Sequence, residues 1–403
     1  MTTLLAPETH DLPLEGGPTE AQRRRSLLLV RLAVAGAGAA MAIQMGLNEN
    51  FLVQDIGVTG LQRGLLETFR ETCGIIAFGV LAILAGLAEP VVGAAMLLLL
   101  GAGLSAYALV HGYAWVVAMS LVWSFGLHVW MPLPNAMTLA LAEPGRAGYR
   151  LGQVAASGAT GFFGGLAAAW LLTLAGVPMR PLYLLAGAAA VLAAGACLGI
   201  HRRLKTPGPR LVFRRKYALY YVLCFLDGWR KQIFICFAVF LLVRRHHAPL
   251  TTILVLWGAV QVIGYLASPH VGRLIDRVGE RRVLLAYYPA LVFVFLGYAF
   301  VQNLYVLFAL FIADGAIFLL ALALTTYVNR LAPKSEHTAT LSMGVAMNHV
   351  AAVTMPLVGG LLWTYVDYRW TFLAGAAAAV LSIPAALCVP RHAPPAAAPP
   401  PAA

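Results

Sequence analysis

Apolar residues dominate the chain in long windows that short polar segments separate. Each window has roughly the 20 residues that an α-helix needs to cross a hydrocarbon core about 30 Å thick. Counted in this way, the pattern predicts an all-α polytopic membrane protein with twelve transmembrane helices. We expect these helices at residues 26–52, 60–85, 90–110, 113–141, 148–176, 180–200, 217–243, 249–271, 282–302, 304–331, 337–366 and 369–389.

The longest segment between two windows, residues 201–216, divides the chain into two equal sets of six helices. This placement indicates an internal duplication, which is common in transporters. The Pro/Ala-rich end of the chain is typical of a disordered tail. The predicted organisation is a disordered cytoplasmic tail at 1–25, a six-helix bundle at 26–201, a basic cytoplasmic loop at 202–216, a second six-helix bundle at 217–390 and a disordered tail at 391–403.

Composition agrees with the membrane interpretation, because 61% of the 403 residues are hydrophobic and only 11% are charged. A soluble domain carries roughly 25% charged residues, so a soluble enzyme is excluded. A net charge of +12 would indicate nucleic acid as the partner of a soluble protein. Here most Lys and Arg residues fall in the loops of one side, which predicts that both termini are cytoplasmic, in a bacterial inner membrane, and that no nucleic acid is bound. The five cysteines lie in apolar windows, and we expect no disulfide, metal site or cofactor.

The segment after the eighth window reads GRLIDRVGERR. It resembles the cytoplasmic signature of the major facilitator superfamily, at the position where that family carries its second copy. The resemblance implies two pseudo-symmetric six-helix bundles that alternate access to a central site lined chiefly by helices one, four, seven and ten. It also implies a cytoplasmic gate motif made by Gly272, Asp276, Arg277, Gly279 and Arg281.

The first half departs from the family pattern. After the second window, the place of the first copy is taken by GLAEPVVG, with Glu89 as its acid and no arginine. In the fifth window the antiporter pattern of the family lacks its proline. Neither the direction of transport nor the coupling ion follows from these segments.

Two windows carry charge at membrane depth, where an unpaired charge costs at least about 2.5 to 3.5 kcal/mol. Spacings of three and four residues place the charges of each window on one helix face. In one interpretation each set is an ion pair that keeps buried charge neutral. In the other, which the resemblance favours, the second set faces the cavity and attracts an anionic or zwitterionic solute. The first set is Glu67, Arg70 and Glu71, and the second is Asp227, Arg230 and Lys231 with Trp229 and Gln232 beside them.

Other polar residues at similar depth complete the predicted site. Asp314 has no basic residue one helical turn away, so we expect it to exchange a proton during transport. In relatives helices two and eleven are neighbours, which would bring His349 next to Glu71 as a second proton-coupling pair. We expect Gln44, Asn48, His128 and Asn135 to contact the solute, with the alternative that each forms a hydrogen bond between helices.

The predicted function is a proton-coupled secondary transporter of a small organic anion or zwitterion, working without a cofactor and as a monomer. An exporter of drugs or metabolites is the alternative within the class, and its cavity should be richer in aromatic residues and poorer in charge. A receptor or scaffold with no solute flux is the alternative from another class. An intramembrane enzyme is disfavoured because the sequence has no zinc-protease, serine-hydrolase or nucleotide-loop motif.

Overall fold

A computed structural model describes residues 19–84, 86–143, 145–201, 204, 213–332 and 334–391. All regular structure in these residues is helical, which confirms the predicted fold class. Residues 1–18 and 392–403, which make up most of the two predicted tails, and much of the predicted basic loop lie outside the described residues.

The first half of the chain forms six spans. α4 and α5 together make the fourth span, and the break between them falls at Pro132, because a proline cannot donate the hydrogen bond that a continuous helix needs. α1 continues into a π-helical turn, Phe51–Ile56. The helices are α1 (Glu20–Asn50), α2 (Gly60–Ile83), α3 (Glu89–Ala106), α4 (Tyr113–Trp130), α5 (Leu133–Leu141), α6 (Ala147–Leu174) and α7 (Met179–Leu198).

The second half forms six more spans, so the predicted number of twelve is confirmed. A short 3-10 turn, Leu319–Ala321, joins α11 and α12 into the tenth span. The helices are α8 (Ala218–Arg244), α9 (Leu250–Val278), α10 (Glu280–Phe300), α11 (Leu304–Phe318), α12 (Leu322–Leu331), α13 (Lys334–Tyr365) and α14 (Tyr368–Leu387).

Ten of the twelve spans are long and apolar enough to cross a membrane by length and hydropathy alone. α2 and α8 do not meet this criterion, because every stretch of 18 residues within them holds more than two charged residues. Both pack on neighbouring spans, α2 against α4 and α13, and α8 against α13 and α14. Their charges are therefore placed among other helices and not in lipid.

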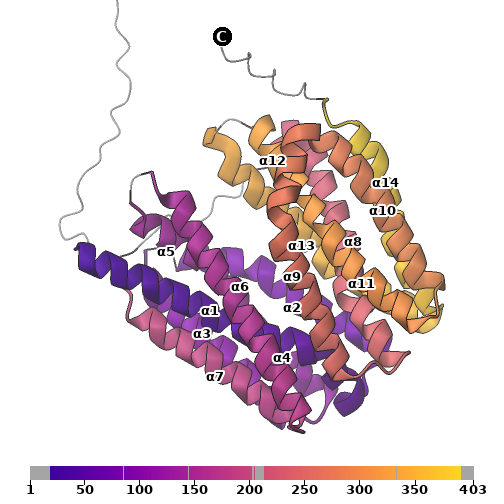
Figure 1. The fold of residues 1–403 in the computed structure, drawn as a ribbon, viewed down its shortest axis with the longest axis horizontal. Coiled ribbons are helices and arrows are strands. Elements are labelled where there is room, and N and C mark those ends of the chain that lie inside the picture. Colours follow the sequence, from indigo (N-terminus) through magenta and orange to yellow (C-terminus); the bar gives the residue numbers. More distant parts are fainter. Residues whose placement is uncertain are drawn as a thin grey trace, which may run out of the picture.

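The two halves form separate lobes, α1 to α7 and α8 to α14 (Figure 1). They meet where α2 packs against α13 and α6 against α9, and they separate at the end that carries α5 and α12 (Figure 1). At the opposite end the Asn50 side chain donates a hydrogen bond to the Ala248 carbonyl at 3.0 Å. There, a Cβ atom on Gly64 would lie 2.2 Å from the carbonyl oxygen of Pro356, so only glycine permits this approach of α2 to α13.

Two boundaries differ from the sequence-based expectation. α1 begins at Glu20 and not at residue 26, because Thr19 and Gln22 form a capping box that starts the helix within the predicted tail. α9 runs to Val278 and not to residue 271, so the first seven residues of the GRLIDRVGERR segment are helical. α2 begins at Gly60, as expected, after an equivalent box made by Thr59 and Gln62, and Arg63 in its first turn is buried.

Candidate functional site

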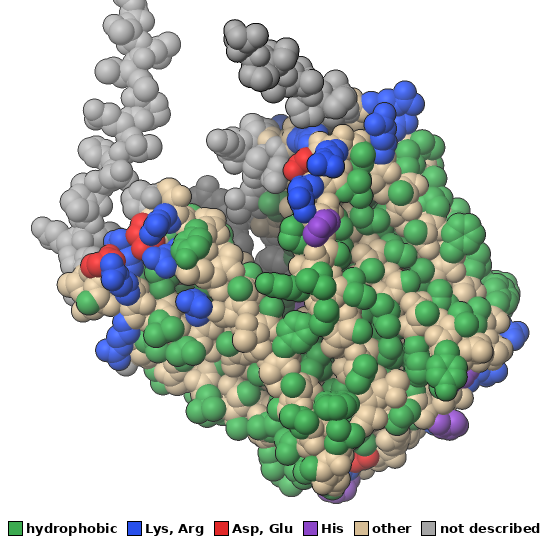
Figure 2. Space-filling model, in the orientation of Figure 1, with side chains coloured by type: hydrophobic (Ala, Val, Ile, Leu, Met, Phe, Trp, Pro, Cys, Tyr) green, Lys and Arg blue, Asp and Glu red, His purple; other side chains and the backbone are tan. Residues whose placement is uncertain are grey.

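A cavity of 590 Å³ lies between the lobes. Its wall runs from Glu49 and Arg63, near the closed end, to Met131 and Thr325 on the side of α5 and α12. Figure 2 shows the molecule hollowed between the lobes at that end, where Lys and Arg side chains also gather. Side chains from α1, α2 and α4 of the first lobe and α8, α9, α12 and α13 of the second line the cavity, so both lobes can touch one solute.

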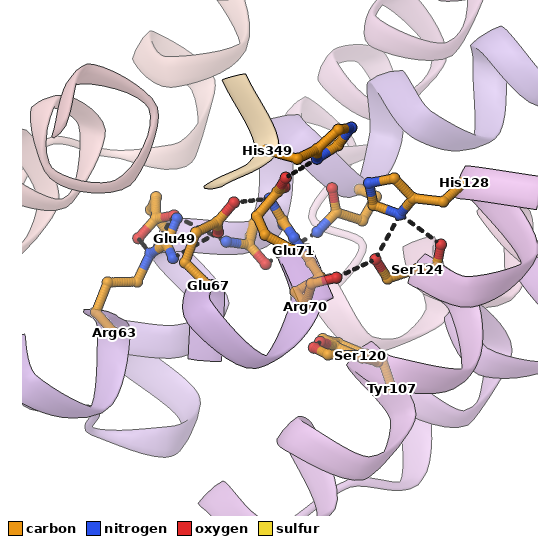
Figure 3. A network of polar contacts seen from close by, with 12 residues as sticks. Glu49, Arg63, Glu67, Arg70, Glu71, Tyr107, Ser120, Ser124, His128 and His349 are labelled. Atoms are coloured by element: carbon orange, nitrogen blue, oxygen red, sulfur yellow. Dashed lines mark hydrogen bonds and ion pairs between the residues drawn. The ribbon is translucent and has the colours of Figure 1, made fainter. Parts of the chain in front are cut away.

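Acidic and basic side chains alternate along the α2 side of this cavity. Two guanidinium groups connect three carboxylates in a series that we call the α2 ladder, made by Glu49, Arg63, Glu67, Arg70 and Glu71 (Figure 3). Arg63 lies 2.9 Å from both Glu49 and Glu67. Arg70 contacts Glu67, and its Nη2 lies 3.8 Å from an oxygen of Glu71. With three acids and two bases, the ladder has a formal charge of −1 at the cavity wall.

The end of the ladder touches the other lobe. Glu71 Oε2 lies 3.3 Å from Nδ1 of His349 on α13. The imidazole of His128, from α4, is the next ring, with its centroid 5.6 Å from that of His349. The predicted proximity of His349 and Glu71 is confirmed, while a proton-coupling role for the pair stays a prediction.

The second charged cluster is arranged differently. Arg230 donates to Asp227 Oδ1 at 3.0 and 3.1 Å, and it also donates to the hydroxyl of Tyr287 on α10. Tyr287 in turn donates to Asp227 at 2.8 Å. Arg230 Nη1 lies 3.9 Å from Asp314 on α11. This arginine is therefore committed to partners of its own lobe.

The expectation that Arg230 faces the cavity is wrong, because successive residues of a helix point about 100° apart and its neighbour Lys231 takes the cavity side. Asp314 does not line the cavity either, and its basic neighbour comes from another helix, which spacing within one helix could not reveal. Trp229 packs against Phe225 outside the cavity wall. Asn135 is exposed on α5 and is likewise absent from the wall.

The remaining predicted residues of the central site do lie together around the cavity. They are Gln44, Asn48, Glu67, Arg70, Glu71, His128, Asp227, Lys231, Gln232 and His349.

Sequence reasoning missed three contributors. Glu49 and Arg63 close the ladder at its outer end, and Trp123 lines the cavity with its ring 5.2 Å from the Arg70 guanidinium carbon. Spacing was the available signal for Arg63, because Arg63 falls within the predicted window 60–85 and lies four residues, one turn, before Glu67.

The predicted gate motif forms the turn between α9 and α10. Gly279 has φ +83°, a conformation that favours glycine. Arg330 at the end of α12 lies 2.9 Å from the buried carboxylate of Glu280 and 3.9 Å from that of Asp276, which is largely exposed. Glu280, which was not among the predicted gate residues, is thus the closer link from this turn to the tenth span.

The other members of the motif lie on the helices beside that turn. Gly272 and Arg277 are on α9, and Arg281 is on α10, where it lines a smaller cavity together with Arg282 and Arg391. At the corresponding place in the first half, Glu89 is buried at the start of α3, and its backbone N–H donates to the Leu204 carbonyl at 3.1 Å.

Twelve spans in two lobes around a central cavity are an architecture that is common among secondary transporters. Solved structures share this fold. A mutant of the nucleoside transporter NupG has a TM-score of 0.76 at 14% identity, over 90% of this chain and 99% of that one. A D-xylose-proton symporter has 0.72 at 12%, over 91% and 98%. A bacterial homologue of the human lysosomal transporter Spinster, in an inward-facing conformation, has 0.68 at 13%, over 92% and 97%.

Residues 221–403 match the family model of the Major Facilitator Superfamily. A search among curated proteins finds no match to the sequence. The matched segment begins in α8 and covers the second lobe, so the family match applies to that lobe, and the solved structures extend the similarity of fold to the first lobe.

Proposed function

We propose that this chain is a secondary transporter of the major facilitator superfamily, and that it carries a small organic solute with an anionic or zwitterionic group by alternating access of its two lobes, coupled to protons. The observation that carries the proposal is Lys231. Its half-buried side chain lines the cavity from α8, and no ion pair joins it to an acidic residue in the described parts of the chain. An ammonium group at this depth is costly unless water or a solute neutralises it. A solute carboxylate or phosphate is a suitable partner.

The opposite wall supports a zwitterion in particular. The α2 ladder on the first lobe carries a formal charge of −1, while Lys231 on the second lobe carries +1. A solute with an amine and an acid would therefore meet complementary charge on both lobes at once. The cavity volume of 590 Å³ lies within the range of about 300 to 1,000 Å³ that is common for small-molecule sites.

The cavity wall also bears on the exporter alternative. Seven Asp, Glu, Lys or Arg side chains line it, against three Trp or Tyr side chains. An exporter of amphipathic drugs is expected to have the reverse balance, because apolar and aromatic side chains supply most of the contact with such compounds. Aliphatic side chains such as Met41, Leu127 and Leu324 line the wall as well, so the wall suits a solute that carries both a charged group and an apolar part.

Proton coupling has two candidate locations. Glu71 and His349 face the cavity from different lobes at 3.3 Å, so a proton shared by them would depend on how the lobes are arranged. Asp314 is buried behind the cavity wall near Arg230, and protonation there would act through that cluster. A carrier with a similar fold is a D-xylose-proton symporter, so the architecture is compatible with proton coupling.

The proposal also assigns the side of the membrane to which the cavity opens. Nineteen of the 28 Lys and Arg residues fall on the side of the gate motif in the predicted topology, and excess positive charge marks the cytoplasmic side. The lobes separate on that side (Figure 1). We therefore assign both termini to the cytoplasm and take this conformation as open to the inside.

Reconstituted vesicles test the proposal. A thermal-shift screen of metabolite anions and zwitterions first selects a solute that raises the melting temperature, and its uptake is then measured under a proton gradient. Lys231→Gln should reduce uptake at least tenfold, about the loss of one charge-assisted hydrogen bond, while Lys231→Arg should retain part of it. Arg245→Gln, a change at the outer end of α8 that leaves the cavity wall intact, is the matched control.

Unchanged uptake in Lys231→Gln would refute the role of Lys231. Absence of saturable flux for every solute in every gradient would refute transport and favour the receptor or scaffold alternative.

A further inference from the structure

Two imidazoles and a carboxylate converge at the inner end of the α2 ladder. Glu71 of α2, His128 of α4 and His349 of α13 each offer a ligand atom, and these atoms all lie within 4.8 Å of one another. All three residues line the central cavity. We propose that they form a binding site for a divalent transition-metal ion that connects the two lobes.

The hydrogen bonds of His128 prepare it as a ligand. Its Nδ1 lies 2.8 Å from the Ser124 carbonyl oxygen, an acceptor only, so Nδ1 carries the proton and donates (Figure 3). The lone pair is then on Nε2. Histidines that bind metals usually donate their second ring nitrogen to a carbonyl or carboxylate, which fixes the tautomer and the ring orientation.

The distances are close to those of a tetrahedral site. With metal–ligand bonds of about 2.0 to 2.1 Å, ligand atoms lie about 3.4 Å apart. Glu71 Oε2 and His349 Nδ1 are already 3.3 Å apart. Closing the site therefore needs mainly an approach of the His128 ring by about an ångström, which small side-chain rotations can supply.

Gly74 makes room for both rings. It follows Glu71 by three residues on α2, and a Cβ atom at this position would lie 2.6 Å from Cε1 of His349 and 3.0 Å from Cδ2 of His128. Any other residue would displace the imidazoles from the carboxylate. The backbone of α2 therefore holds the three ligands together.

The chemistry of the ligand set defines the class of ion. Two imidazoles and one carboxylate suit Zn²⁺, Co²⁺ or Ni²⁺, whereas Mg²⁺ and Ca²⁺ prefer oxygen ligands. The nearest cation, Arg70, lies 3.8 Å from Oε1 of Glu71, but its shorter contact is to Glu67 and it also packs on the face of Trp123, so Oε2 of Glu71 is the oxygen available to a metal. Three protein ligands leave a fourth position open toward the cavity, where water or a solute anion can bind.

The site has a consequence for movement that does not depend on the proposed solute. Its ligands come from two helices of the first lobe and one helix of the second. A bound ion would hold α13 against α2 and α4, and so would favour the arrangement of the lobes that brings the ligands together.

Metal titration of the full-length chain in detergent, with any affinity tag removed, tests the site. Because the adjacent His246 and His247 could bind metal at the surface, all proteins carry His246→Ala and His247→Ala. Calorimetry with Zn²⁺ should show one ion per chain, and Mg²⁺ should show none. His128→Ala, His349→Ala and Glu71→Gln should each weaken binding at least tenfold, the lower end of the effect of disturbing even an outer partner.

Two further variants separate a lost ligand from lost folding. His128→Cys supplies a thiolate ligand, so Co²⁺ should bind again with a new sulfur-to-metal absorption band. His270→Ala removes an exposed histidine of α9 and should leave the titration unchanged.

The proposal is wrong if the background protein binds no Zn²⁺, or if the ligand variants titrate like His270→Ala. Because no solute or flux is involved, these results leave the proposed transport function untouched.

Discussion

Arg63 is the residue whose removal should destabilise the first lobe most. Its side chain is only 2% exposed, and its guanidinium lies 2.9 Å from both Glu49 and Glu67. Arg63→Met retains much of the side-chain length but leaves two buried carboxylates close together without their shared cation. Breaking one buried ion pair by removing one partner costs about 3 to 5 kcal/mol. Glu49 loses its ionic partner, and Glu67 retains Arg70 but then shares the site with an uncompensated carboxylate, so we expect the upper end of this range, about 5 kcal/mol.

That magnitude is large for a lobe of this size. A change of 1 kcal/mol shifts the melting temperature of a unit of 150 to 250 residues by about 2 to 4 °C, so Arg63→Met should melt at least about 10 °C lower. Thermal unfolding in detergent, followed by the fraction that remains monodisperse on size exclusion, measures the difference. Arg180→Met is the matched control: Arg180 lies 3.2 Å from Asp55 and also donates to the carbonyls of Ala108 and Val110, but both side chains of the ion pair are about a quarter exposed, so its loss should cost about 1 to 2 kcal/mol.

Neutralising the two acids that contact Arg63 should restore part of the stability that Arg63→Met loses. When Arg63→Met is combined with Glu49→Gln and Glu67→Gln, no uncompensated charge remains, and neutral replacement of a buried ion pair is often tolerated. The triple variant should therefore melt higher than Arg63→Met alone. If Arg63→Met melts like Arg180→Met, or if the triple variant is no better than the single one, the ladder does not stabilise the lobe in the way inferred here.

Two other predictions concern charge outside the α2 ladder. Arg230→Gln should lower the yield of folded protein, because Asp227 and Asp314 lose their cation. A normal yield together with loss of transport would instead indicate that Arg230 binds the solute. Glu143 lies in the loop before α6, and Arg150, in the first turn of α6, lies 2.5 Å from it and lowers the pKa of that carboxyl from 4.5 to about 2. Its stabilising contribution is complete above the unfolded pKa of about 4.5 and is lost as the pH falls toward 2. The melting temperature of Glu143→Gln should fall less between pH 6 and pH 3 than that of the unchanged chain. An equal fall in both proteins would contradict this linkage.

The fold was largely predictable from the sequence because hydrocarbon thickness sets the length of every span. Even α2 and α8 were recognised, although their charges lower the hydropathy signal, since apolar residues flank those charges on both sides. Starts of helices were less accurate. The capping box at Thr19 starts α1 six residues before the predicted window, and it is a local polar pattern that hydropathy windows do not detect.

The site was predictable only in part. The depth of a residue in the membrane follows from its position along the helix. Together with the helix neighbours that the resemblance implies, this depth correctly predicted that His349 lies next to Glu71. The direction in which a side chain points depends on how each helix is rotated about its axis. Arg230 and Lys231 are adjacent in sequence, yet one is bound within its lobe and the other lines the cavity. No pattern within α8 could distinguish them, because the Tyr287 and Asp314 partners of Arg230 come from other helices.

The division of charge between the lobes bears on how the carrier can move. Arg230 is tied to partners of its own lobe, so its cluster can travel with that lobe as a unit. The α2 ladder is likewise held within the first lobe and reaches the other at His349. Contacts at the closed end include single hydrogen bonds, such as that from Asn50 to Ala248, each worth about 1 kcal/mol. A rearrangement of the lobes would therefore leave the buried ion pairs within each lobe intact and would break contacts between lobes, such as this hydrogen bond and the contact of Glu71 with His349.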